Sequence, residues 1–414
     1  MQTQLADFIR DSSAGREAEA ILRACVHCGF CTATCPTYQL LGDELDGPRG
    51  RIYLIKEALQ GAPVTAKTQV HLDRCLTCRS CETTCPSGVQ YARLLDIGRE
   101  VVATRVRRDL LARWQRGALK FLLTSPRLFA PAYRLGQWLR PLLPRRLRAM
   151  VLPYRAPGAL PAGGQRRRML LLAGCVQPAM APSINAASAR LLAALGIELV
   201  TAARAGCCGA IPLHLDDVAG ARAAARRNID AWWPLLEAGA EAIVVTATGC
   251  ATQVRDYAHL LHEDPDYAAK AARVTLLSRD ISEVVGGERA ALLALLEKIP
   301  RQAPLKLAFH APCSLQHGLQ LRGVIEDLLR AAGFVLTPVA DGHLCCGSAG
   351  SYSVLQPEIA GRLRRNKLAA LAAGGPAAIA SANIGCLAHL QADTTTPVRH
   401  WVEYVEEKIR GADQ

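Results

Sequence analysis

The stretch HLDRCLTCRSCETTCPSGVQ, residues 71–90, places four cysteines within eleven positions and a proline directly after the last of them. A second stretch, ACVHCGFCTATCPTYQ at residues 24–39, repeats this arrangement upstream. The chain has sixteen cysteines in 414 residues, and its first residues lack the pattern of a secretory signal, so disulfides are not expected. Thiols gathered in such tight groups indicate metal ligation.

Both stretches have the spacing C-x2-C-x2-C-x3-C-P, which is that of bacterial ferredoxins with two [4Fe–4S] clusters. Three close thiolates wrap one cluster, and the fourth cysteine of each stretch ligates the other cluster. The predicted ligands are Cys25, Cys28, Cys31 and Cys85 for one cluster, and Cys75, Cys78, Cys81 and Cys35 for the other. Zinc is the alternative, but structural zinc sites usually take their cysteines as separated pairs.

The segment between the two stretches, DELDGPRGRIYLIKEAL at residues 43–59, opens with the turn residues Asp-Gly-Pro and continues with a helical pattern. Two arginines, Arg49 and Arg51, stand at the start of this pattern. They are expected to be surface or interface charges, and hydrogen bonds toward a cluster are the alternative.

The other eight cysteines form an internal repeat. The first copy contains Cys175, Cys207, Cys208 and Cys250, and the second contains Cys313, Cys345, Cys346 and Cys386. A glycine follows each Cys-Cys pair, the first spacing is 32 residues in both copies, and the copies are offset by 138 residues. Self-similarity at a fixed offset indicates a duplicated structural element.

Short apolar runs precede these cysteines and alternate with helical patterns such as SARLLAALG and RGVIEDLLRAAG. Apolar strands separated by helices are typical of buried parallel sheets, whose functional residues gather after the carboxyl ends of the strands. Four thiols per copy would then converge, which suggests a further cluster or metal site in each. Small buried thiols or a vicinal disulfide are the alternatives. Four histidines near these cysteines are expected to be structural, namely His310, His317, His343 and His389.

Residues 101–168 hold sixteen Lys and Arg and a single acidic residue, so the net charge of +13 is concentrated there. The run RVRRDLLARWQRGALKFLL, residues 105–123, is predicted to be an amphipathic helix with Trp114 and Phe121 on its apolar face. Arg beside Trp, Phe and Leu is the composition of a helix that lies on anionic lipid. An acidic partner and a solvated arm are the alternatives. Nucleic acid is not expected, because no single-strand-binding module accompanies the basic residues.

The expected fold class is α+β and multidomain. The predicted domains are a helical two-[4Fe–4S] ferredoxin domain at 1–100, a basic helical linker at 101–166, and two α/β parallel-sheet repeats at 167–300 and 301–414. The sequence contains no G-x-G-x-x-G after a strand, no P-loop and no G-x-S-x-G. Without a dinucleotide or flavin fingerprint, the chain is expected to be an electron-transfer subunit whose catalytic flavin lies on another chain.

The combination of two ferredoxin stretches and two Cys-Cys-Gly repeats resembles the iron–sulfur subunits of heterodisulfide reductases, anaerobic glycerol-3-phosphate dehydrogenase and lactate utilisation. Five segments more specifically resemble the glycolate oxidase (glycolate dehydrogenase) iron–sulfur subunit family. They are GDELDGPRGRIYLIKEAL, LDRCLTCRSCETTCPSGVQY, HLCCGSAGSYSVLQPEIA, ANIGCLAHLQ and TPVRHWVE. That resemblance covers nearly the whole chain and is weakest across residues 101–168.

The resemblance implies partner subunits with FAD that oxidise glycolate to glyoxylate, and an electron path through this chain to a quinone or another acceptor. It also implies a membrane-associated complex, so the chain is expected to be cytoplasmic and peripheral on the inner face of the cell membrane. The composition of residues 101–168 makes that segment a candidate for the membrane contact. An iron–sulfur subunit of a related lactate or glycerol-3-phosphate dehydrogenase is the first alternative. A chain whose repeat clusters are themselves catalytic, and a scaffold or sensor that binds membrane or nucleic acid, are the others.

The sequence departs from the heterodisulfide reductase relatives at the last element of each repeat, which is C-x-x-C in those proteins. Here Gln253 and His389 stand in the place of the second cysteine. The unusual clusters of those relatives are therefore not expected here. Four cysteines per repeat can still hold a cubane, and sites that are only relics are the alternative.

Overall fold

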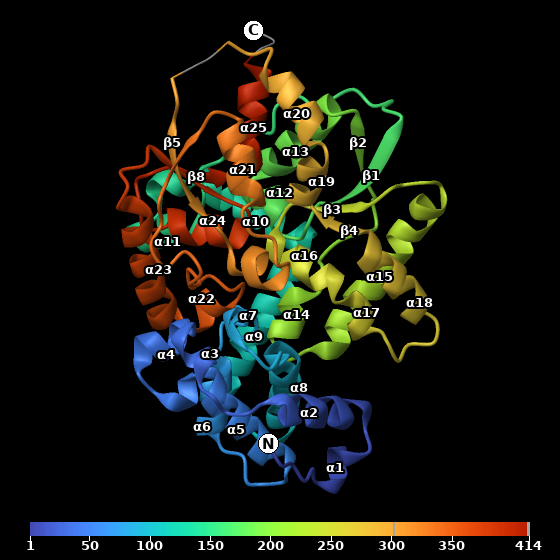
Figure 1. The fold of residues 1–414 in the computed structure, drawn as a ribbon, viewed down its shortest axis with the longest axis vertical. Helices are drawn as coiled ribbons and strands as arrows, with labels where there is room; N and C mark the ends of the chain where they lie inside the picture. Colours follow the sequence, from blue (N-terminus) through green and yellow to red (C-terminus); the bar gives the residue numbers. More distant parts are fainter. Residues whose placement is uncertain (301–302, 412–414) are drawn as a thin grey trace. The chain divides into compact units, whose positions relative to one another are not determined.

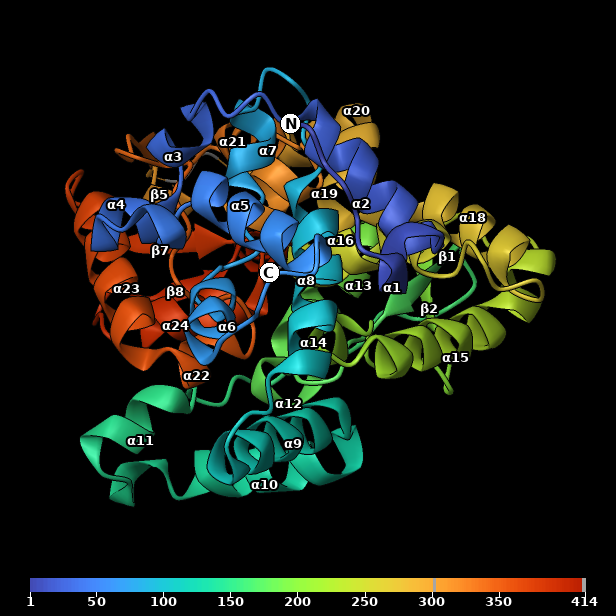
Figure 2. The same ribbon diagram turned by 90° about the horizontal axis from the view of Figure 1, so that it is seen from below.

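The computed structural model describes residues 1–300 and 303–411 (Figures 1 and 2). Internal contacts divide the chain into two units. The first unit comprises residues 1–119, 213–216 and 343–367, and the second comprises residues 120–212, 217–342 and those from 368 onward. The predicted domain boundary at residue 301 lies outside the described residues. In the described part of the chain, none of the helices combines the length and apolar composition needed to cross a bilayer.

Short helices and tight loops make up the N-terminal part of the first unit. They are α1 (Asp7–Arg10), α2 (Ser13–Ala24), α3 (Phe30–Ala33), α4 (Pro36–Leu41), η1 (Glu44–Asp46), α5 (Pro48–Leu59), α6 (Ala66–Asp73), α7 (Ser80–Thr84) and α8 (Tyr91–Arg105). Helix α5 confirms the helix predicted after the turn, and it begins at a proline, whose fixed φ suits the first turn. Ile55 and Leu59 of α5 pack with Leu94 and Leu95 of α8 in a fully buried core.

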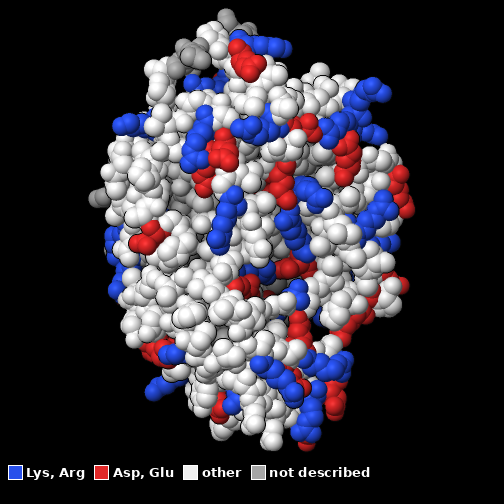
Figure 3. Space-filling view, viewed as in Figure 1, with Lys and Arg blue, Asp and Glu red and all other residues white. Residues whose placement is uncertain are grey.

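The basic segment is helical over most of residues 110–150, whereas residues 151–166, which also belong to the predicted helical linker, contain no helix. It forms α9 (Leu110–Thr124), α10 (Pro126–Trp138), η2 (Arg140–Leu142) and α11 (Arg145–Met150). The helix predicted from residue 105 begins only at Leu110, because α8 ends at Arg105 and residues 106–109 are not helical. Helix α10 lies beside α12 (Gln177–Met180), where Gln137 Nε2 donates to the Met180 carbonyl over 3.4 Å (Figure 2). Basic and acidic side chains are otherwise interspersed over the face drawn in Figure 3.

The second unit contains two four-stranded parallel sheets with the same strand order, β2-β1-β3-β4 and β6-β5-β7-β8. The first consists of β1 (Arg167–Leu172), β2 (Ile197–Thr201), β3 (Ile243–Val245) and β4 (Ser278–Asp280). The second consists of β5 (Lys306–His310), β6 (Val335–Thr337), β7 (Ala378–Ser381) and β8 (Val398–His400). The shared order confirms the duplicated parallel-sheet architecture and the α+β class.

Helices follow most of these strands. They are α13 (Pro182–Ala194), α14 (Ala210–His214), α15 (Val218–Glu237), α16 (Thr248–Arg255), α17 (Tyr257–Leu260), α18 (Ala268–Leu277), α19 (Ile281–Gly287), α20 (Arg289–Leu296), η3 (Ser314–Gly318), α21 (Val324–Ala331), α22 (Tyr352–Leu355), α23 (Pro357–Ala372), α24 (Ile384–Gln391) and α25 (Trp401–Arg410). The predicted helices at SARLLAALG and RGVIEDLLRAAG are α13 and α21.

The two repeats pack together inside the second unit. Helices α13 and α25 lie side by side (Figure 1). Arg190 Nε on α13 donates to Glu406 Oε1 on α25 over 2.6 Å. The Thr248 backbone N–H donates to the Ala382 carbonyl over 3.2 Å. The carboxyl ends of β3 and β7, each of which leads into a cysteine-bearing helix, are therefore next to each other.

Candidate metal centres

One open pocket of the first unit is lined by cysteines from both N-terminal stretches. Its empty volume, open solvent included, is about 430 Å³, and its five cysteines are the predicted set Cys25, Cys28, Cys31 and Cys85 together with Cys81. Cys28 is exposed, and the neighbouring Val26 and Phe30 are 68% and 60% exposed. The structure thus brings the four thiols of the first predicted set together beside the solvent.

The second set of the first unit consists of Cys35, Cys75, Cys78 and Cys81. The Cys81 thiol has the other three among its electrostatic neighbours. Only Cys78 of this set is half-buried, and the others are buried. Tyr91 Oη donates to Cys75 Sγ over 3.7 Å, and the Thr77 backbone N–H donates to the same sulfur over 3.4 Å. The second set is therefore more enclosed than the first.

Left-handed residues wind both cysteine loops at matching positions. His27 and Gly29 flank Cys28 with φ of 56° and 83°, and Thr77 and Arg79 flank Cys78 with φ of 50° and 59°. Each non-glycine residue in this region carries a strain of about 1–3 kcal/mol. The same strained winding in both loops indicates that each backbone is shaped to wrap a compact group.

The chemistry of the two sets fits iron–sulfur clusters. Burial raises the pKa of Cys81 well above its usual range, and burial with neighbouring thiols raises the pKa of Cys31 to about 11. Metal binding reverses this preference, because a coordinating thiol is deprotonated. Arg51 Nη2 is buried without a hydrogen-bond partner among the described residues, although Asp46 Oδ1 lies 3.5 Å away. Bound anionic clusters would supply the negative charge that this cation faces.

Four thiols also converge in the first repeat. Hydrogen bonds link Cys175 with Cys207, Cys207 with Cys208, and Cys208 with Cys250. The four residues follow β1, β2 and β3, and Cys250 lies in the first turn of α16. The structure therefore places the four thiols of this repeat beyond the carboxyl ends of its strands.

A hydrogen-bond network fixes the Cys-Cys pair of the first repeat. Asn228 Nδ2 donates to the Cys207 carbonyl over 2.9 Å, and Tyr257 Oη donates to the Cys208 carbonyl over 2.8 Å. The Gly209 backbone N–H donates to Cys207 Sγ over 3.5 Å. Hydrogen bonds from Cys175 and Cys208 lower the pKa of Cys207 to about 3. The site is therefore arranged to hold at least one thiolate.

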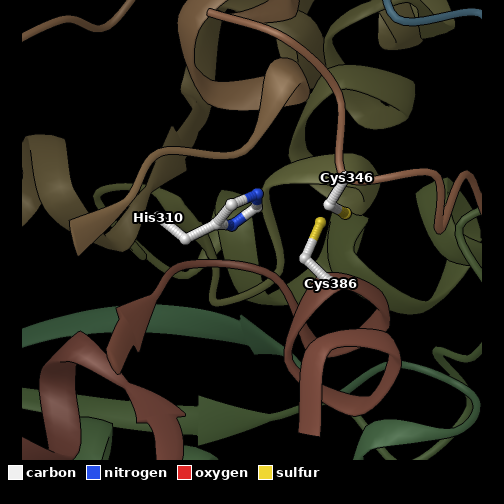
Figure 4. A group of neighbouring side chains, drawn as sticks. All are labelled: His310, Cys346 and Cys386. Atoms are coloured by element: carbon white, nitrogen blue, oxygen red, sulfur yellow. The ribbon is translucent and has the colours of Figure 1, made fainter. Parts of the chain in front are cut away.

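The second repeat distributes its cysteines over both units. Cys313 and Cys386 belong to the second unit, and Cys345 and Cys346 belong to the first. A ring nitrogen of His310 lies within 4.8 Å of Cys386 Sγ (Figure 4). Asn383 Nδ2 donates to Cys386 Sγ over 3.4 Å. The Gly347 backbone N–H donates to Cys345 Sγ over 3.4 Å, as Gly209 does to Cys207 in the first repeat.

The residues that replace the last cysteine of each repeat lie on the helices that carry Cys250 and Cys386. Gln253 on α16 is buried, and its Nε2 has no hydrogen-bond partner among the described residues. His389 occupies the matching place on α24 and is half-buried. His310, one of the predicted structural histidines, has Nδ1 3.0 Å from Ser381 Oγ.

Several residues that shape these centres were not expected from the sequence. Arg51 is 1% exposed, so the expectation of a surface charge was wrong for it and correct only for Arg49, which is 39% exposed. Tyr91, Asn228 and Tyr257 carry no motif, because their importance comes from contacts with residues far along the chain. The Asp46-Gly47-Pro48 turn was the available signal for Arg51, since it fixes where α5 starts and so which face Arg51 occupies.

Comparisons with known proteins agree with this architecture. Residues 21–89 match the family model of the 4Fe-4S dicluster domain, and residues 169–255 and 307–391 each match the cysteine-rich domain. These matches confirm a ferredoxin domain with two [4Fe–4S] clusters followed by two cysteine-rich repeats.

Three relatives show how far the similarity extends. The glycolate oxidase iron–sulfur subunit of Escherichia coli is 53% identical over 411 residues, which is 99% of each chain. The probable glycolate oxidase iron–sulfur subunit of Bacillus subtilis is 29% identical over 91% of this chain and 90% of that protein. Lactate utilization protein A of an Exiguobacterium species is 25% identical over 58% of this chain and 98% of that protein. This chain therefore belongs to the family of glycolate oxidase iron–sulfur subunits.

Proposed function

We propose that this chain is the electron-transferring iron–sulfur subunit of an enzyme that oxidises glycolate to glyoxylate. The observation that carries the proposal is the presence of two complete four-thiol sets in the first unit of a chain that is 53% identical to a glycolate oxidase iron–sulfur subunit. When bound, [4Fe–4S] clusters accept and release single electrons.

In this proposal Cys25, Cys28, Cys31 and Cys85 hold one cluster, and Cys35, Cys75, Cys78 and Cys81 hold the other. The exchange of the fourth ligand between the stretches is supported by the position of Cys85 in the first pocket and of Cys35 beside Cys81. Cys75 and Cys81 are buried, and Tyr91 and Thr77 donate toward the Cys75 sulfur.

Cys175, Cys207, Cys208 and Cys250 are proposed to hold a further cluster or metal. The linked thiols and the network of Asn228 and Tyr257 support this site. By duplication, Cys313, Cys345, Cys346 and Cys386 are proposed as the equivalent set of the second repeat. The replacement of a cysteine by Gln253 and His389 supports electron transfer as the role of the repeats, in preference to the disulfide chemistry of their C-x-x-C relatives.

The flavin that oxidises the substrate is proposed to lie on partner subunits, since the sequence has no dinucleotide fingerprint. A quinone or another carrier is proposed as the acceptor. The test is to purify the complex anaerobically and to follow acceptor-dye reduction with glycolate, D-lactate and L-lactate. Glycolate is expected to be the active donor. Reduction by a lactate with glycolate inert would assign the chain to a lactate-oxidising enzyme.

Peripheral membrane contact on the cytoplasmic side is proposed for α9. Leu110, Trp114 and Phe121 of this helix are 80%, 71% and 65% exposed, and the helix has no buried residue. Its basic face is the one that turns inward, because Arg116 forms ion pairs with Asp73 and Asp216 over 3.1 and 3.2 Å. An exposed aromatic and aliphatic stripe of this kind suits the boundary between lipid headgroups and acyl chains.

A further inference from the structure

Arg51 is a fully buried cation in the middle of the first unit. Its side chain is 1% exposed, and its Nε donates to the His71 carbonyl over 2.7 Å. Its Nη1 donates to Thr37 Oγ1 over 3.2 Å, and Thr37 Oγ1 lies 3.3 Å from Cys35 Sγ. The guanidinium is thus one hydroxyl group away from a sulfur of the second set. Cys75, a second sulfur of that set, is also among its electrostatic neighbours.

Positive charge exceeds negative charge around the second set. Asp46 is buried and supplies one carboxylate, which faces Arg51 Nη2 over 3.5 Å and accepts from Arg74 Nη1 over 2.8 Å. Arg99, also buried, donates through Nη2 to the Cys75 carbonyl over 3.0 Å. Three arginines therefore lie near these thiols, against the carboxylates of Asp46 and of Glu82, which is an electrostatic neighbour of Cys81.

The first set lacks an equivalent charge among the described residues that line its pocket. The arginine at this pocket is Arg49, which is 39% exposed and donates to Glu44 Oε1 over 2.6 Å. Its charge is neutralised by that carboxylate and screened by water, whereas the charge of Arg51 acts through a low-dielectric interior. Helix α5 thus carries one arginine near each set. Arg49, near the first set, is exposed and neutralised, whereas Arg51, near the second set, is buried.

We infer that Arg51 raises the reduction potential of the cluster held by Cys35, Cys75, Cys78 and Cys81 above that of the cluster held by Cys25, Cys28, Cys31 and Cys85. Reduction adds a negative charge, and a nearby buried cation stabilises the more negative state. Hydrogen bonds to the sulfurs act in the same direction, and the Thr77 backbone N–H and Tyr91 Oη both donate to the Cys75 sulfur. Arg51 acts through its charge on the cluster and does not contact a substrate. The inference rests on the proposed assignment of the two ligand sets.

The test is a redox titration of the full chain, purified anaerobically with its clusters, in which the two signals are followed by electron paramagnetic resonance. Arg51→Met is expected to shift one midpoint potential downward and leave the other in place. Arg51→Lys keeps the positive charge, so its midpoint potential is expected to stay close to that of the wild type. Arg49→Met is the matched control and is expected to move neither potential appreciably. Full iron content with both potentials unchanged in Arg51→Met would overturn the inference.

A second variant keeps the test decisive if Arg51→Met does not retain its iron. Thr37→Val preserves the side-chain volume and removes the hydroxyl that connects Arg51 to Cys35. It is expected to give a smaller downward shift of the same signal, and an unchanged potential at full iron content would again overturn the inference. Glycolate-dependent dye reduction by the wild-type complex is measured separately. The proposed function can therefore fail without affecting the comparison of potentials.

Discussion

Tyr257 donates its phenolic hydrogen to the carbonyl oxygen of Cys208 over 2.8 Å, although the two residues are 49 positions apart. The Tyr257 side chain is fully buried and also accepts a hydrogen bond from Asn228 Nδ2 over 2.9 Å. Asn228 Nδ2 in turn donates to the Cys207 carbonyl. The peptide groups of the Cys-Cys pair are therefore anchored to two helices, α15 and α17, that lie well apart in the sequence.

Tyr257→Phe is expected to destabilise the protein by about 1–3 kcal/mol, because it leaves the buried carbonyl of Cys208 without its donor. The measurement is the urea unfolding midpoint at constant pH. Tyr267→Phe is the matched control, since the Tyr267 hydroxyl donates to the exposed Asp230 carboxylate over about 3 Å and its loss should change stability by less than about 0.5 kcal/mol. Equal effects of the two substitutions would contradict the anchoring role of Tyr257.

The glycine of each Cys-Cys-Gly element separates what the sequence could predict from what it could not. The repeat and its fixed spacing predicted two parallel sheets of the same architecture. The reason for a glycine at this position could not be predicted. Gly209 and Gly347 have φ of 93° and 92°, and a Cβ at these positions would lie 3.1 Å from the Ala221 carbonyl oxygen and 2.7 Å from that of Ala360. The lack of space for a Cβ comes from α15 at Gly209 and from α23 at Gly347. Each helix follows its glycine in the chain, so only the folded structure shows the close approach.

The sequence could group the eight N-terminal cysteines into two sets because the spacing of a ligand motif is a local property. It could not predict the environment of the sulfurs, since that environment depends on long-range contacts. The orientation of α9 could be predicted only in part. Its periodicity predicted an apolar and a basic face, and an apolar face can either pack against the protein or lie on lipid. Here Arg108 and Arg116 pair with Asp73 and Asp216, and the apolar face is exposed. Acidic residues at least 35 positions away along the chain therefore fix that orientation.

His400 is expected to make stability depend on pH. Burial lowers the pKa of this histidine to about 4, and in the folded state Nε2 donates to the Thr246 carbonyl over 3.0 Å. Its Nδ1 accepts from the Val402 backbone N–H over 3.3 Å. In the unfolded chain the imidazole takes up a proton below about pH 6.5. The associated stability is therefore present above pH 6.5 and lost as pH falls toward 4, by about 3 kcal/mol in total.

The measurement is the free energy of unfolding between pH 7.5 and 5 for the wild type and His400→Gln, which cannot titrate. The wild type should lose more stability over this range than the variant. Asp280, whose pKa is raised by burial to about 6, acts in the opposite direction in both proteins, so the difference between them isolates His400. Parallel pH profiles for the two proteins would contradict the prediction.

The exchange of the fourth ligand predicts which cysteine variants behave alike. Cys85→Ser should alter the same paramagnetic signal as Cys28→Ser, because both residues line the first pocket. Cys35→Ser should alter the same signal as Cys78→Ser, because both lie near Cys81. Each variant should lose up to about four irons per chain. Pairing of Cys35→Ser with Cys28→Ser would mean instead that each stretch holds its own cluster.

The exposed face of α9 predicts lipid binding. Trp114→Gln with Phe121→Gln should reduce co-sedimentation of the protein with vesicles of anionic lipid several-fold, without changing thermal stability, because both side chains are exposed. Leu276→Gln is the control, since Leu276 is equally exposed on α18. Full binding by the double variant, or no binding by the wild type, would leave the stripe as a surface for another protein.

Iron content tests the repeats themselves. Two cubanes in the first unit account for about eight irons per chain. The linked thiols of the first repeat predict that anaerobically purified wild type contains more than this, and that Cys208→Ser with Cys346→Ser lowers the count toward eight. Acid-labile sulfide measured on the same samples distinguishes clusters from single metal ions, because only clusters contribute sulfide. A count of eight in both proteins would show that the repeats carry no cluster. The buried thiols, with the network of Asn228 and Tyr257, would then serve packing or partner binding, and the acceptor would have to be sought at the first unit.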